Sequence, residues 1–448
     1  MALRLDEHPT VQNFRRQAGA VPPAPSTPLD ADWLRQLALD AGADDVGFVE
    51  IDRAELAPQR ADIEALLPGT RTLVSLVCRM NRGPIRAVPR SVANGEFHRV
   101  TNELNDAAAA LVEALEARDI RAVNPTPGFP MEMSRFPGGK VWTVSHKPVA
   151  VAAGLGQMGI HRNVIHPRFG SFILLGTVLL EAPVTCYDRP VAYNPCLECK
   201  LCVAACPTGA IAPDGHFDFS ACYTHNYREF MGGFNDWVET IAESKGARDY
   251  RQRVSASESA SMWQSLSFGA NYKAAYCLAV CPAGEEVIAP FLTDRPAFLR
   301  QVVNPLQDKE ETVYVVPGSD AEAYVARRFP HKKTQRVGNG LRTESVQRFL
   351  GGLPLVFQRE QSKGLNATYH FTFTGEETRK ATVVIRHQTI EVTDGHVGKP
   401  DVHVIADSRT WIRLLAKEAN PIWAVLRGRI RVKGSLRYLL AFRKCFPS

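Results

Sequence analysis

The sequence predicts three folded parts: an α/β domain, a cysteine-rich module and a C-terminal α+β domain. Helical and extended runs alternate over the first 190 residues, which is typical of an α/β domain. Seven of the ten cysteines lie between Cys196 and Cys281, and a new succession of helices and strands begins near Val346. A chain of 448 residues is also too long for one ordinary core.

The first domain is expected over residues 29–190, after a polar, proline-rich stretch at residues 1–28 that is predicted to be a flexible arm. Residues 29–51 show an apolar helical face, a glycine stop and then an extended apolar run, which predicts a helix followed by a strand. Two further buried strands are predicted at 71–80 and 169–182, with a long helix starting near Thr101 between them.

The C-terminal half of the chain is predicted to contain a linker and a separate domain. Residues 306–345 are polar and mixed in charge, which favours a linker. Residues 346–448 predict an α+β domain that opens with a helix. The extended runs that follow are ATYHFTFTG, KATVVIRHQTIEVTDG and DVHVIAD, and the later helical runs include RTWIRLLAKEAN and PIWAVLRG.

The composition is that of a soluble globular protein, with 45% hydrophobic and 22% charged residues. The net charge of +6 is modest and does not by itself indicate nucleic-acid binding. From Arg409 to the end there are ten Lys and Arg and one acidic residue, Glu418. Such a bias is typical of a solvated basic face, or of contact with an acidic partner, a phosphate-bearing ligand or a membrane surface.

The expected location is the cytoplasm. No run of 18 apolar residues is present, so no membrane span is predicted. Arg15 and Arg16 are not followed by an apolar stretch, which argues against an export signal. A tight cysteine cluster in a large chain indicates metal binding in a reducing compartment rather than a disulfide framework.

The run NPCLECKLCVAACPTGAI carries the most specific chemistry. It has the spacing C-x2-C-x2-C-x3-C-P of bacterial-type ferredoxins that hold 4Fe–4S clusters, and its cysteines are Cys196, Cys199, Cys202 and Cys206. In that pattern three thiolates surround one cluster and the fourth serves a second cluster. Zinc sites normally use paired Cys-x-x-Cys units instead. Residues 191–305 are therefore predicted to form a two-cluster ferredoxin module.

The remaining ligands must come from further along the chain. Cys281 also precedes a proline and is the natural fourth ligand of cluster one, which is then an ordinary 4Fe–4S site. Cluster two is expected to use Cys206, Cys222 and Cys277.

One ligand of cluster two is missing from the pattern, because Ala274 stands where a cysteine is expected. Cluster two is then predicted to be 3Fe–4S, or 4Fe–4S with a non-cysteine ligand such as His225. Cys186 is the reserve thiol.

Residues from about Leu29 to Pro282 resemble the epoxyqueuosine reductases and, more distantly, the reductive dehalogenases. The resemblance is carried by AAGLGQMGIHRNVIHPRFGSFILLGTVLLEAP at 152–183, followed by the cysteine motifs. It implies a cobalamin-dependent iron–sulfur reductase whose first domain is of the cobalamin-binding type and holds base-off cobalamin through its backbone. The residues that match or neighbour the segments facing the corrin are Gly154, Gly156, Gly159, His161, Arg162, Asn163, Phe169 and Gly170.

The same segment contains the pattern G-x-G-x-x-G, which raises a rival interpretation. A dinucleotide-binding fingerprint should open a helix after a strand. The residues that follow include Pro167 and Gly170 and make a poor helix, which disfavours nucleotide binding.

The sequence departs from the epoxyqueuosine reductase pattern in two respects. The resemblance implies a catalytic aspartate before the Ala-Gly-Leu-Gly segment, and Lys140 lies near that position. Lys140, His146 and Tyr193 are the candidate proton donors, each with a surface or packing role as the alternative. The repeat region that engages tRNA in many members is also missing from the sequence pattern, so a tRNA substrate is not expected.

Residues 346–445 resemble the sterol-carrier-protein family of lipid-binding domains. The segments that carry this resemblance are FTFTG, VVIRHQTIEVTDG, DVHVIADSRTWIRLLA and PIWAVLRGRIRVKGSLRYLLAF. It implies an apolar tunnel for lipids, with a dimerisation or docking module as the alternative.

The sequence as a whole predicts an oxidoreductase that acts on a small, apolar, possibly lipid-like molecule. It would draw electrons from an external low-potential donor, without a nucleic-acid partner. The alternative is a ferredoxin-like electron-transfer protein that contains no corrinoid and docks on another redox enzyme through its basic C-terminus.

Overall fold

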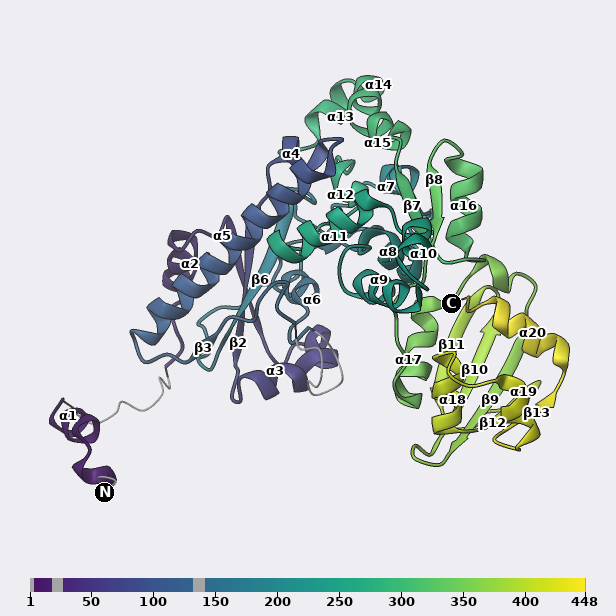
Figure 1. Cartoon of the computed structure of the whole chain (residues 1–448). Coiled ribbons are helices and arrows are strands. Elements are labelled where there is room, and N and C mark those ends of the chain that lie inside the picture. The colour runs from purple at the N-terminus through teal and green to yellow at the C-terminus, as the bar shows by residue number, and fades with distance from the viewer. Residues whose placement is uncertain (1–3, 18–26, 132–141, 448) are drawn as a thin grey trace.

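The computed structural model describes residues 4–17, 27–131 and 142–447 (Figure 1). Two short helices, η1 (Leu5–Glu7) and α1 (Pro9–Gln17), occupy the described part of the predicted arm. The folded body then follows in three parts, in the order expected from the sequence. Among the described residues, no helix is long and apolar enough to cross a membrane.

The first part is built on a four-stranded sheet. Its strand order is β1-β2-β6-β3, and every neighbouring pair is antiparallel. The strands are β1 (Asp45–Glu50), β2 (Thr72–Arg79), β3 (Ala122–Val123) and β6 (Ile173–Leu180). The α/β prediction therefore needs correction to α+β, because alternation of helix and strand along the chain does not determine strand direction.

Helices cover both faces of this sheet. On one face α2 (Ala31–Asp40) and the long α5 (Arg90–Glu116) enclose a core with strand residues such as Leu76 and Val178. On the other face lie η2 (Ala54–Gln59), α3 (Arg60–Leu66) and α6 (His146–Ala152). The long helix begins well before Thr101, whose hydroxyl donates to the Phe97 carbonyl within the helix instead of capping it.

The segment with the G-x-G-x-x-G pattern forms a small hairpin. The helix α6 ends before it, and the strands β4 (Gln157–Met158) and β5 (Val164–Ile165) pair in antiparallel fashion after it. No helix opens at the glycines, which agrees with the rejection of a dinucleotide site.

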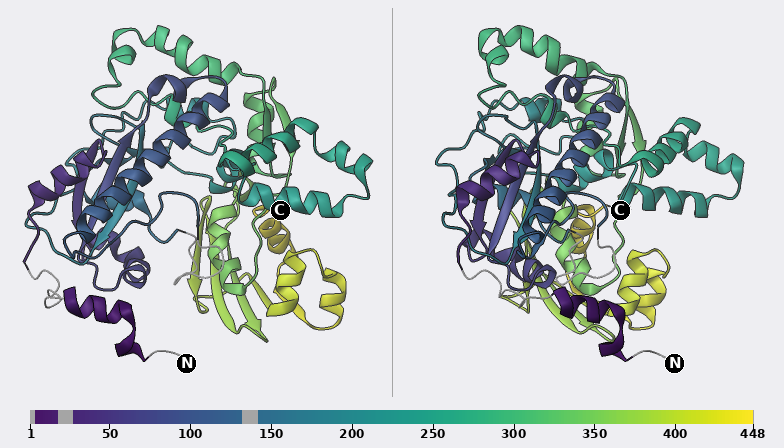
Figure 2. Two further views of the ribbon diagram at one scale, coloured as in Figure 1. Left: turned by 60° about the vertical axis from the view of Figure 1, so that its left-hand side comes forward. Right: turned by 90° about the vertical axis from the view of Figure 1, so that its left-hand side faces the viewer.

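The cysteine-rich part consists of short helices around tight turns. Its ligand-bearing helices are α7 (Leu201–Ala205), α8 (Phe219–Asn226) and α12 (Tyr276–Ala279). An insertion between α8 and α12 projects from the body (Figure 2) and contains α9 (Gly232–Glu243), α10 (Ala247–Arg253) and α11 (Ala256–Phe268). Four short helices close this part: α13 (Ala289–Thr293), α14 (Arg295–Phe298), the π-helix η4 (Leu299–Val303) and α15 (Asn304–Asp308).

The predicted linker at 306–345 is a folded element, which corrects the sequence-based boundary. It contains the parallel pair β7 (Thr312–Val315) and β8 (Lys333–Arg336), joined by α16 (Asp320–Arg328). Val313, Val315 and Val325 belong to the same core as the cysteine-rich part. The polar composition is misleading because charged groups there are buried with partners: the Lys332 ammonium donates to the carbonyls of residues 306 and 309 and to Glu311.

The C-terminal part is a five-stranded sheet covered by helices. Its strand order is β11-β10-β9-β12-β13, and only the β9–β12 pair is parallel. The strands are β9 (Ala367–Thr374), β10 (Arg379–Arg386), β11 (Thr389–Asp394), β12 (Val402–Asp407) and β13 (Ile430–Gly434). The helical elements are α17 (Val346–Val356), η5 (Glu360–Ser362), α18 (Ser408–Leu415), α19 (Pro421–Leu426) and α20 (Leu436–Lys444).

The extended run KATVVIRHQTIEVTDG divides into two strands. His387 and Gln388 both have positive φ and form the two-residue turn between β10 and β11. The sequence did not predict this turn, because His387 and Gln388 stand where such a turn usually has glycine or asparagine.

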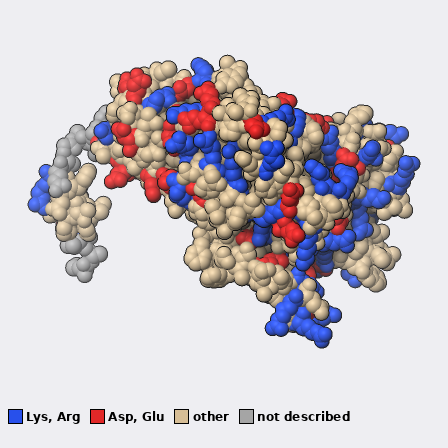
Figure 3. Space-filling model, turned by 90° about the horizontal axis from the view of Figure 1, so that it is seen from above, with Lys and Arg blue, Asp and Glu red and all other residues tan. Residues whose placement is uncertain are grey.

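Charged groups of both signs lie side by side over much of the surface seen in Figure 3, which agrees with the modest net charge.

Candidate iron–sulfur centre

The first group of thiols lines a single cavity. Cys196 and Cys199 reach it from the turn before α7, Cys202 from α7 itself, and Cys281 from the segment just after α12. These are the four thiols predicted for cluster one. Glu198 and Lys200 have positive φ, and these left-handed residues fold the backbone tightly between the cysteines.

The second group contains the three thiols predicted for cluster two. Burial raises the pKa of Cys222 well above its usual range, and the nearby Cys206 and Cys277 raise it further. Burial and the neighbouring Cys206 raise the pKa of Cys277 to about 12. These effects place Cys206 and Cys277 near Cys222, and Cys277 also raises the pKa of Cys202 in the first group.

Burial opposes ionisation of these thiols. Burial raises the pKa of Cys199 and Cys202, and it raises the pKa of Cys281 to about 11. Without a metal these groups remain neutral thiols at neutral pH. A cluster that binds thiolates must therefore displace protons and supply the positive charge that stabilises them. Among the described residues, no group of three or more His, Cys, Asp or Glu side chains is placed to hold a single metal ion, so the cluster sites stay predictions.

The turn around Ala274 keeps the shape of a ligand loop. Ala275 has positive φ directly before α12, as Lys200 does before α7. The side-chain oxygen of Asn226 accepts hydrogen bonds from the backbone N–H groups of Ala274 and Ala275, at 3.0 and 3.1 Å. The backbone is thus held in place, and what position 274 lacks is the thiol alone.

The two reserve ligands for cluster two have other surroundings. The Nδ1 atom of His225 accepts a hydrogen bond from the backbone N–H of Tyr314 at 3.3 Å, and the ring stacks on Tyr314. Cys186 is exposed, and its Sγ lies 3.9 Å from the carbonyl oxygen of Tyr187. None of these contacts involves Cys206, Cys222 or Cys277. The Nε2 of His225 is buried without a partner among the described residues, so its role as a ligand stays a prediction.

His161 presents an unused hydrogen-bond donor to cluster one. It lines the same cavity as the first four thiols, and its Nδ1 accepts the backbone N–H of Asn163 at 3.1 Å. Burial lowers the pKa of the imidazole to about 4, so the ring is neutral and carries its hydrogen on Nε2. Within the described residues, Nε2 is buried and has no partner.

Asn163 connects the same segment to cluster two. Its side-chain nitrogen lies 3.8 Å from the Cys277 sulfur, and its side-chain oxygen accepts a hydrogen bond from the Lys147 ammonium at 2.9 Å. Lys147 also donates to the carbonyl of Arg162. The ammonium thereby orients the amide so that its N–H groups point toward sulfur.

The glycines predicted to face a corrin are explained by contacts within the chain. At Gly154, Gly156 and Gly170, φ is positive and a Cβ would collide with the carbonyl oxygens of Arg189, Ile165 and Ala283, respectively. At Gly159 a Cβ would collide with the Ile165 side chain. The described residues therefore provide no evident cradle for cobalamin at these glycines, and their role as cofactor contacts stays a prediction.

Phe169 and Arg162, the remaining predicted corrin contacts, differ in environment. Phe169 is buried and stacks on His166 with a centroid distance of 4.7 Å. Arg162 is exposed and has positive φ in the turn between β4 and β5.

The three candidate proton donors are in different situations. Lys140 lies outside the described residues. His146 is buried, with Nδ1 2.9 Å from the Thr177 hydroxyl and Nε2 3.3 Å from the Thr126 carbonyl. Burial lowers the pKa of His146 to about 4, which leaves no proton to donate from an imidazolium at neutral pH. Tyr193 is 56% exposed, beside the first cysteine run.

Two arginines near the thiols, the half-buried Arg86 and the buried Arg90, were not predicted from the sequence. Arg86 Nε donates to the carbonyl of Ala279 within α12. Burial lowers the pKa of Arg86 to about 10, and the nearby Cys281 raises it. Burial also lowers the pKa of Arg90, and the nearby Cys277 raises it. Cations near the thiols favour negative charge on them. No motif marks them, because they come from α4 (Arg82–Arg86) and α5 of the first part.

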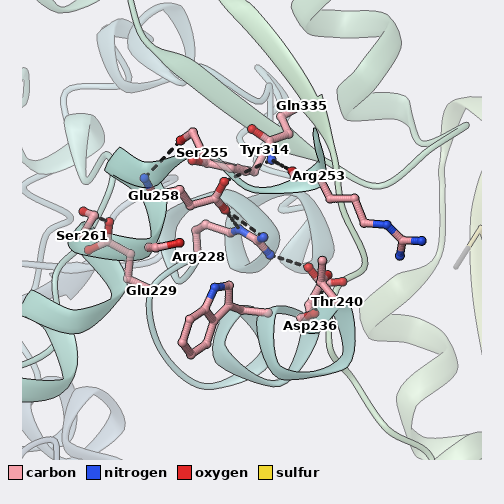
Figure 4. A network of polar contacts seen from close by, with 12 residues as sticks. Arg228, Glu229, Asp236, Thr240, Arg253, Ser255, Glu258, Ser261, Tyr314 and Gln335 are labelled. Atoms are coloured by element: carbon pink, nitrogen blue, oxygen red, sulfur yellow. Dashed lines mark hydrogen bonds and ion pairs between the residues drawn. The ribbon is translucent and has the colours of Figure 1, made fainter. Parts of the chain in front are cut away.

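Another buried arginine anchors the projecting insertion (Figure 4). Arg228 pairs with Asp236 of α9 and Glu258 of α11, and its guanidinium lies over the Tyr314 ring at 5.1 Å. Glu229, the next residue, pairs with Lys273. The network ties the insertion to β7 and to the turn that carries Ala274.

Two groups of neighbouring thiols on tight turns mark the candidate centre, and their role as cluster ligands stays a prediction. The comparisons with known proteins are more specific. The chain is 25% identical over 239 residues to an epoxyqueuosine reductase of Vibrio cholerae, which covers 45% of this chain and 59% of that protein. It is 26% identical over 257 residues to the Escherichia coli epoxyqueuosine reductase, which covers 48% and 62%. The chain thus spans about three-fifths of the length of these relatives.

The C-terminal part matches a different family. Residues 357–447 match the family described as the SCP-2 sterol transfer family. The chain therefore has epoxyqueuosine reductase homologues and carries an SCP2 domain at its C-terminus, which confirms both predicted resemblances.

Solved structures give partial likenesses. An epoxyqueuosine reductase in complex with a tRNA-Tyr stem loop has a TM-score of 0.30 at 20% identity, over 43% of this chain and 56% of that chain. A catabolic reductive dehalogenase has a TM-score of 0.32 at 18% identity, over 42% and 26%. Sterol carrier protein 2 of Yarrowia lipolytica has a TM-score of 0.21 at 14% identity, over 24% and 98%. The epoxyqueuosine reductase structure contains a tRNA stem loop, whereas the sequence of this chain predicts no nucleic-acid partner.

Proposed function

We propose that the chain is an iron–sulfur and cobalamin-dependent reductase of a small, apolar substrate. The observation that supports it is the convergence of seven cysteines into groups of four and three, in a chain similar to epoxyqueuosine reductases. In this proposal the group that includes Cys196 and Cys281 holds a 4Fe–4S cluster. The group of Cys206, Cys222 and Cys277 holds a 3Fe–4S cluster, or a 4Fe–4S cluster with one non-cysteine ligand.

The chain would contribute to electron transfer by holding and tuning these centres. An external low-potential donor supplies the electrons, and the potentials depend on ligands, hydrogen bonds to sulfur and solvent exposure. His161 offers its Nε2–H to the first centre, and Asn163 offers an amide N–H to the second. Arg86 and Arg90 offset the negative charge that reduction adds.

Cobalamin belongs to the proposal through the similarity to epoxyqueuosine reductases and not through a cradle at the predicted glycines. When bound base-off, it would supply the reductive chemistry at the substrate. We assign no step to it. Tyr193 is the candidate proton donor that is described and exposed, and Lys140 remains a second candidate.

The apolar character of the proposed substrate rests on the SCP2 domain. Its core contains a cluster of rings in which Phe349 packs against Phe371, Phe373 and Trp411 at 5.4–6.1 Å between centroids. Trp411 Nε1 is buried without a partner among the described residues, although a buried indole N–H usually has one. A lipid-like molecule with a polar atom near this N–H would accept its hydrogen bond. The proposed substrate is therefore lipid-like, and a tRNA substrate is not part of the proposal.

Metal analysis and paramagnetic spectroscopy of the anaerobically purified full chain test the proposal. We expect seven or eight irons per chain, and uptake of cob(II)alamin with changes in its optical and paramagnetic spectra. Iron without uptake of cob(II)alamin would instead favour the alternative, a ferredoxin-like electron carrier without corrinoid. Turnover of epoxyqueuosine-containing tRNA would refute the apolar substrate but leave the reductase assignment intact.

The role of the SCP2 domain has its own test. Fluorescent fatty acids and sterols should bind the full chain, and Trp411→Phe should weaken binding of ligands with a polar group several-fold relative to wild type. Absence of binding by every probe would remove the lipid-like substrate and favour a dimerisation or docking module.

A further inference from the structure

The helix α11 of the projecting insertion turns polar residues inward and large apolar residues outward. Its buried positions are Glu258, Met262 and Ser265. Its exposed positions include Trp263, Leu266 and Phe268, each of which is more than half exposed. A helix that served only to cover the core would have the opposite arrangement. These three apolar side chains are therefore available to another molecule.

The helix α9 of the same insertion also exposes apolar side chains. Val238 and Ile241 are both exposed, and they share one side of the helix because they lie three residues apart. Figure 2 shows that the insertion projects from the body of the protein, which leaves both helices accessible. We refer to Val238, Ile241, Trp263, Leu266 and Phe268 as the insertion face.

Polar contacts inside the insertion hold the insertion face in a fixed arrangement. The Trp237 indole N–H donates to the Tyr250 hydroxyl at 3.0 Å, which joins α9 to α10. The Tyr250 hydroxyl lies 2.6 Å from the Ser259 hydroxyl, which joins α10 to α11. Arg228 pairs with both α9 and α11 from below (Figure 4). A surface that is ordered in advance loses little conformational entropy when it binds.

The charge of the insertion indicates which kind of partner it fits. Glu258 is the one charged residue of α11, and it is buried in its ion pair with Arg228. Residues 232–268 as a whole contain five acidic and four basic side chains. Nucleic acid and anionic lipid attract surfaces with a surplus of cations, and this surface has none. An apolar, uncharged protein surface is the complementary partner.

We propose that the insertion face joins two copies of this chain in a symmetric dimer. A two-fold contact brings the same surface against itself, so that surface must be complementary to its own copy. The exposed side of α11 meets this condition, because it brings no like charges together. Exposed aromatic residues such as Trp263 and Phe268 are typical of the centre of such interfaces.

The rim of the insertion offers charges of both signs for contacts between the two copies. Arg248 and Arg251 on α10 are exposed, and neither has an ion pair among the described residues. Glu243 on α9 is exposed and pairs with Arg253 only at 3.7 Å. A carboxylate of one copy and a guanidinium of the other can therefore pair at the rim, which would fix the orientation of the dimer.

The dimer goes beyond the proposed function. It uses none of the thiols, so its formation does not depend on a bound cluster or corrinoid.

Analytical ultracentrifugation of the full-length protein over a range of concentrations tests the proposal. We expect a reversible dimer of the 49.4 kDa chain. Trp263→Ala should raise the dissociation constant at least about tenfold, because a Trp at the centre of an interface contributes much of the binding. Trp423→Ala is the matched control: both Trp side chains are 58% exposed, and Trp423 lies on α19 of the C-terminal part. The control should leave the dissociation constant unchanged.

A charge placed at the centre of the contact gives a second test. Leu266→Asp should abolish the dimer at the same concentrations, because the two-fold axis brings two carboxylates into one apolar contact. Leu292→Asp, at an exposed leucine of α13, should not. Hydrogen exchange adds a local measurement: the amides of α11 should exchange more slowly as the concentration of the wild type rises, and not in Leu266→Asp.

Three results would overturn the proposal: a monomer at every concentration, a dimer that neither Trp263→Ala nor Leu266→Asp weakens, or equal losses in test and control variants. A dimer that only Trp423→Ala dissociates would place the contact on the C-terminal part instead.

Discussion

Replacement of His161 by Phe removes the unused N–H donor at the first group of thiols while keeping a ring of similar size. The imidazole lines the cavity that these thiols share, and its Nε2 is buried without a partner among the described residues. When a cluster occupies the cavity, its sulfur atoms are the acceptors within the same space. We expect the variant to have a lower reduction potential at cluster one, since N–H donors stabilise the more negative, reduced state.

The size of the effect follows from the strength of such a bond. A hydrogen bond to a charged acceptor contributes about 1.5–3 kcal/mol. For a one-electron couple a tenfold change, about 1.4 kcal/mol, corresponds to about 59 mV. The full bond would then shift the potential by about 60–130 mV. Both redox states accept the bond and only the difference counts, so we expect a decrease on the order of 30–60 mV.

The assay is a redox titration of the anaerobic protein followed by paramagnetic spectroscopy. His225→Phe is the matched control: burial lowers the pKa of His225 to about 4 as well, and its Nε2 is also unpartnered, but its contacts are with Tyr314. The control should leave the potential of cluster one unchanged. An unchanged potential in His161→Phe, or an equal decrease in both variants, would refute the assignment of the donor.

Three further predictions concern the second group of thiols and the stability of the fold. Ala274→Cys should convert cluster two to an ordinary 4Fe–4S site with eight irons per chain, because Asn226 already holds the turn; unchanged iron content and spectra would contradict this. Arg228→Met should lower the free energy of unfolding by about 3–5 kcal/mol, since it removes the cation that pairs with the buried Glu258 and the half-buried Asp236. The exposed pair of Arg342 and Glu239 gives the control Arg342→Met, expected to cost under about 1 kcal/mol in the same denaturant titration. Burial lowers the pKa of His146 and His225 to about 4, so the unfolded chain binds more protons between pH 6.5 and 4. Stability should be full above pH 6.5 and fall through that window, by up to about 3 kcal/mol per histidine; a flat profile in denaturant titrations would contradict it.

The thiol groups were predictable because their signal is local. The spacing of the first run and the Cys-Pro at Cys281 are properties of short segments, and short turns determine which way each thiol points. The same reasoning identified Ala274 as the departure. It could not predict that Asn226 keeps the turn in shape, because the side chain comes from α8 and forms its bonds across the fold.

Features that depend on distant contacts were missed or misjudged. The sheet of the first part is antiparallel, and nothing in the order of helices and strands reveals strand direction. The predicted linker is folded because its few valines complete a core whose other members are far away in sequence. Arg90 and Arg228 are buried and Arg86 is half-buried, although arginine is usually a surface residue, so composition gave no reason to look for them.

The segment from His161 to Asn163 has a further consequence. One of its ends lines the space of the first thiol group, and the other end approaches the Cys277 sulfur of the second, with a single residue between them. These three residues therefore contact the surroundings of both thiol groups. A ligand could displace this segment, or Lys147 could release the carbonyl of Arg162. Either movement would change the surroundings of both centres, so both reduction potentials would shift together.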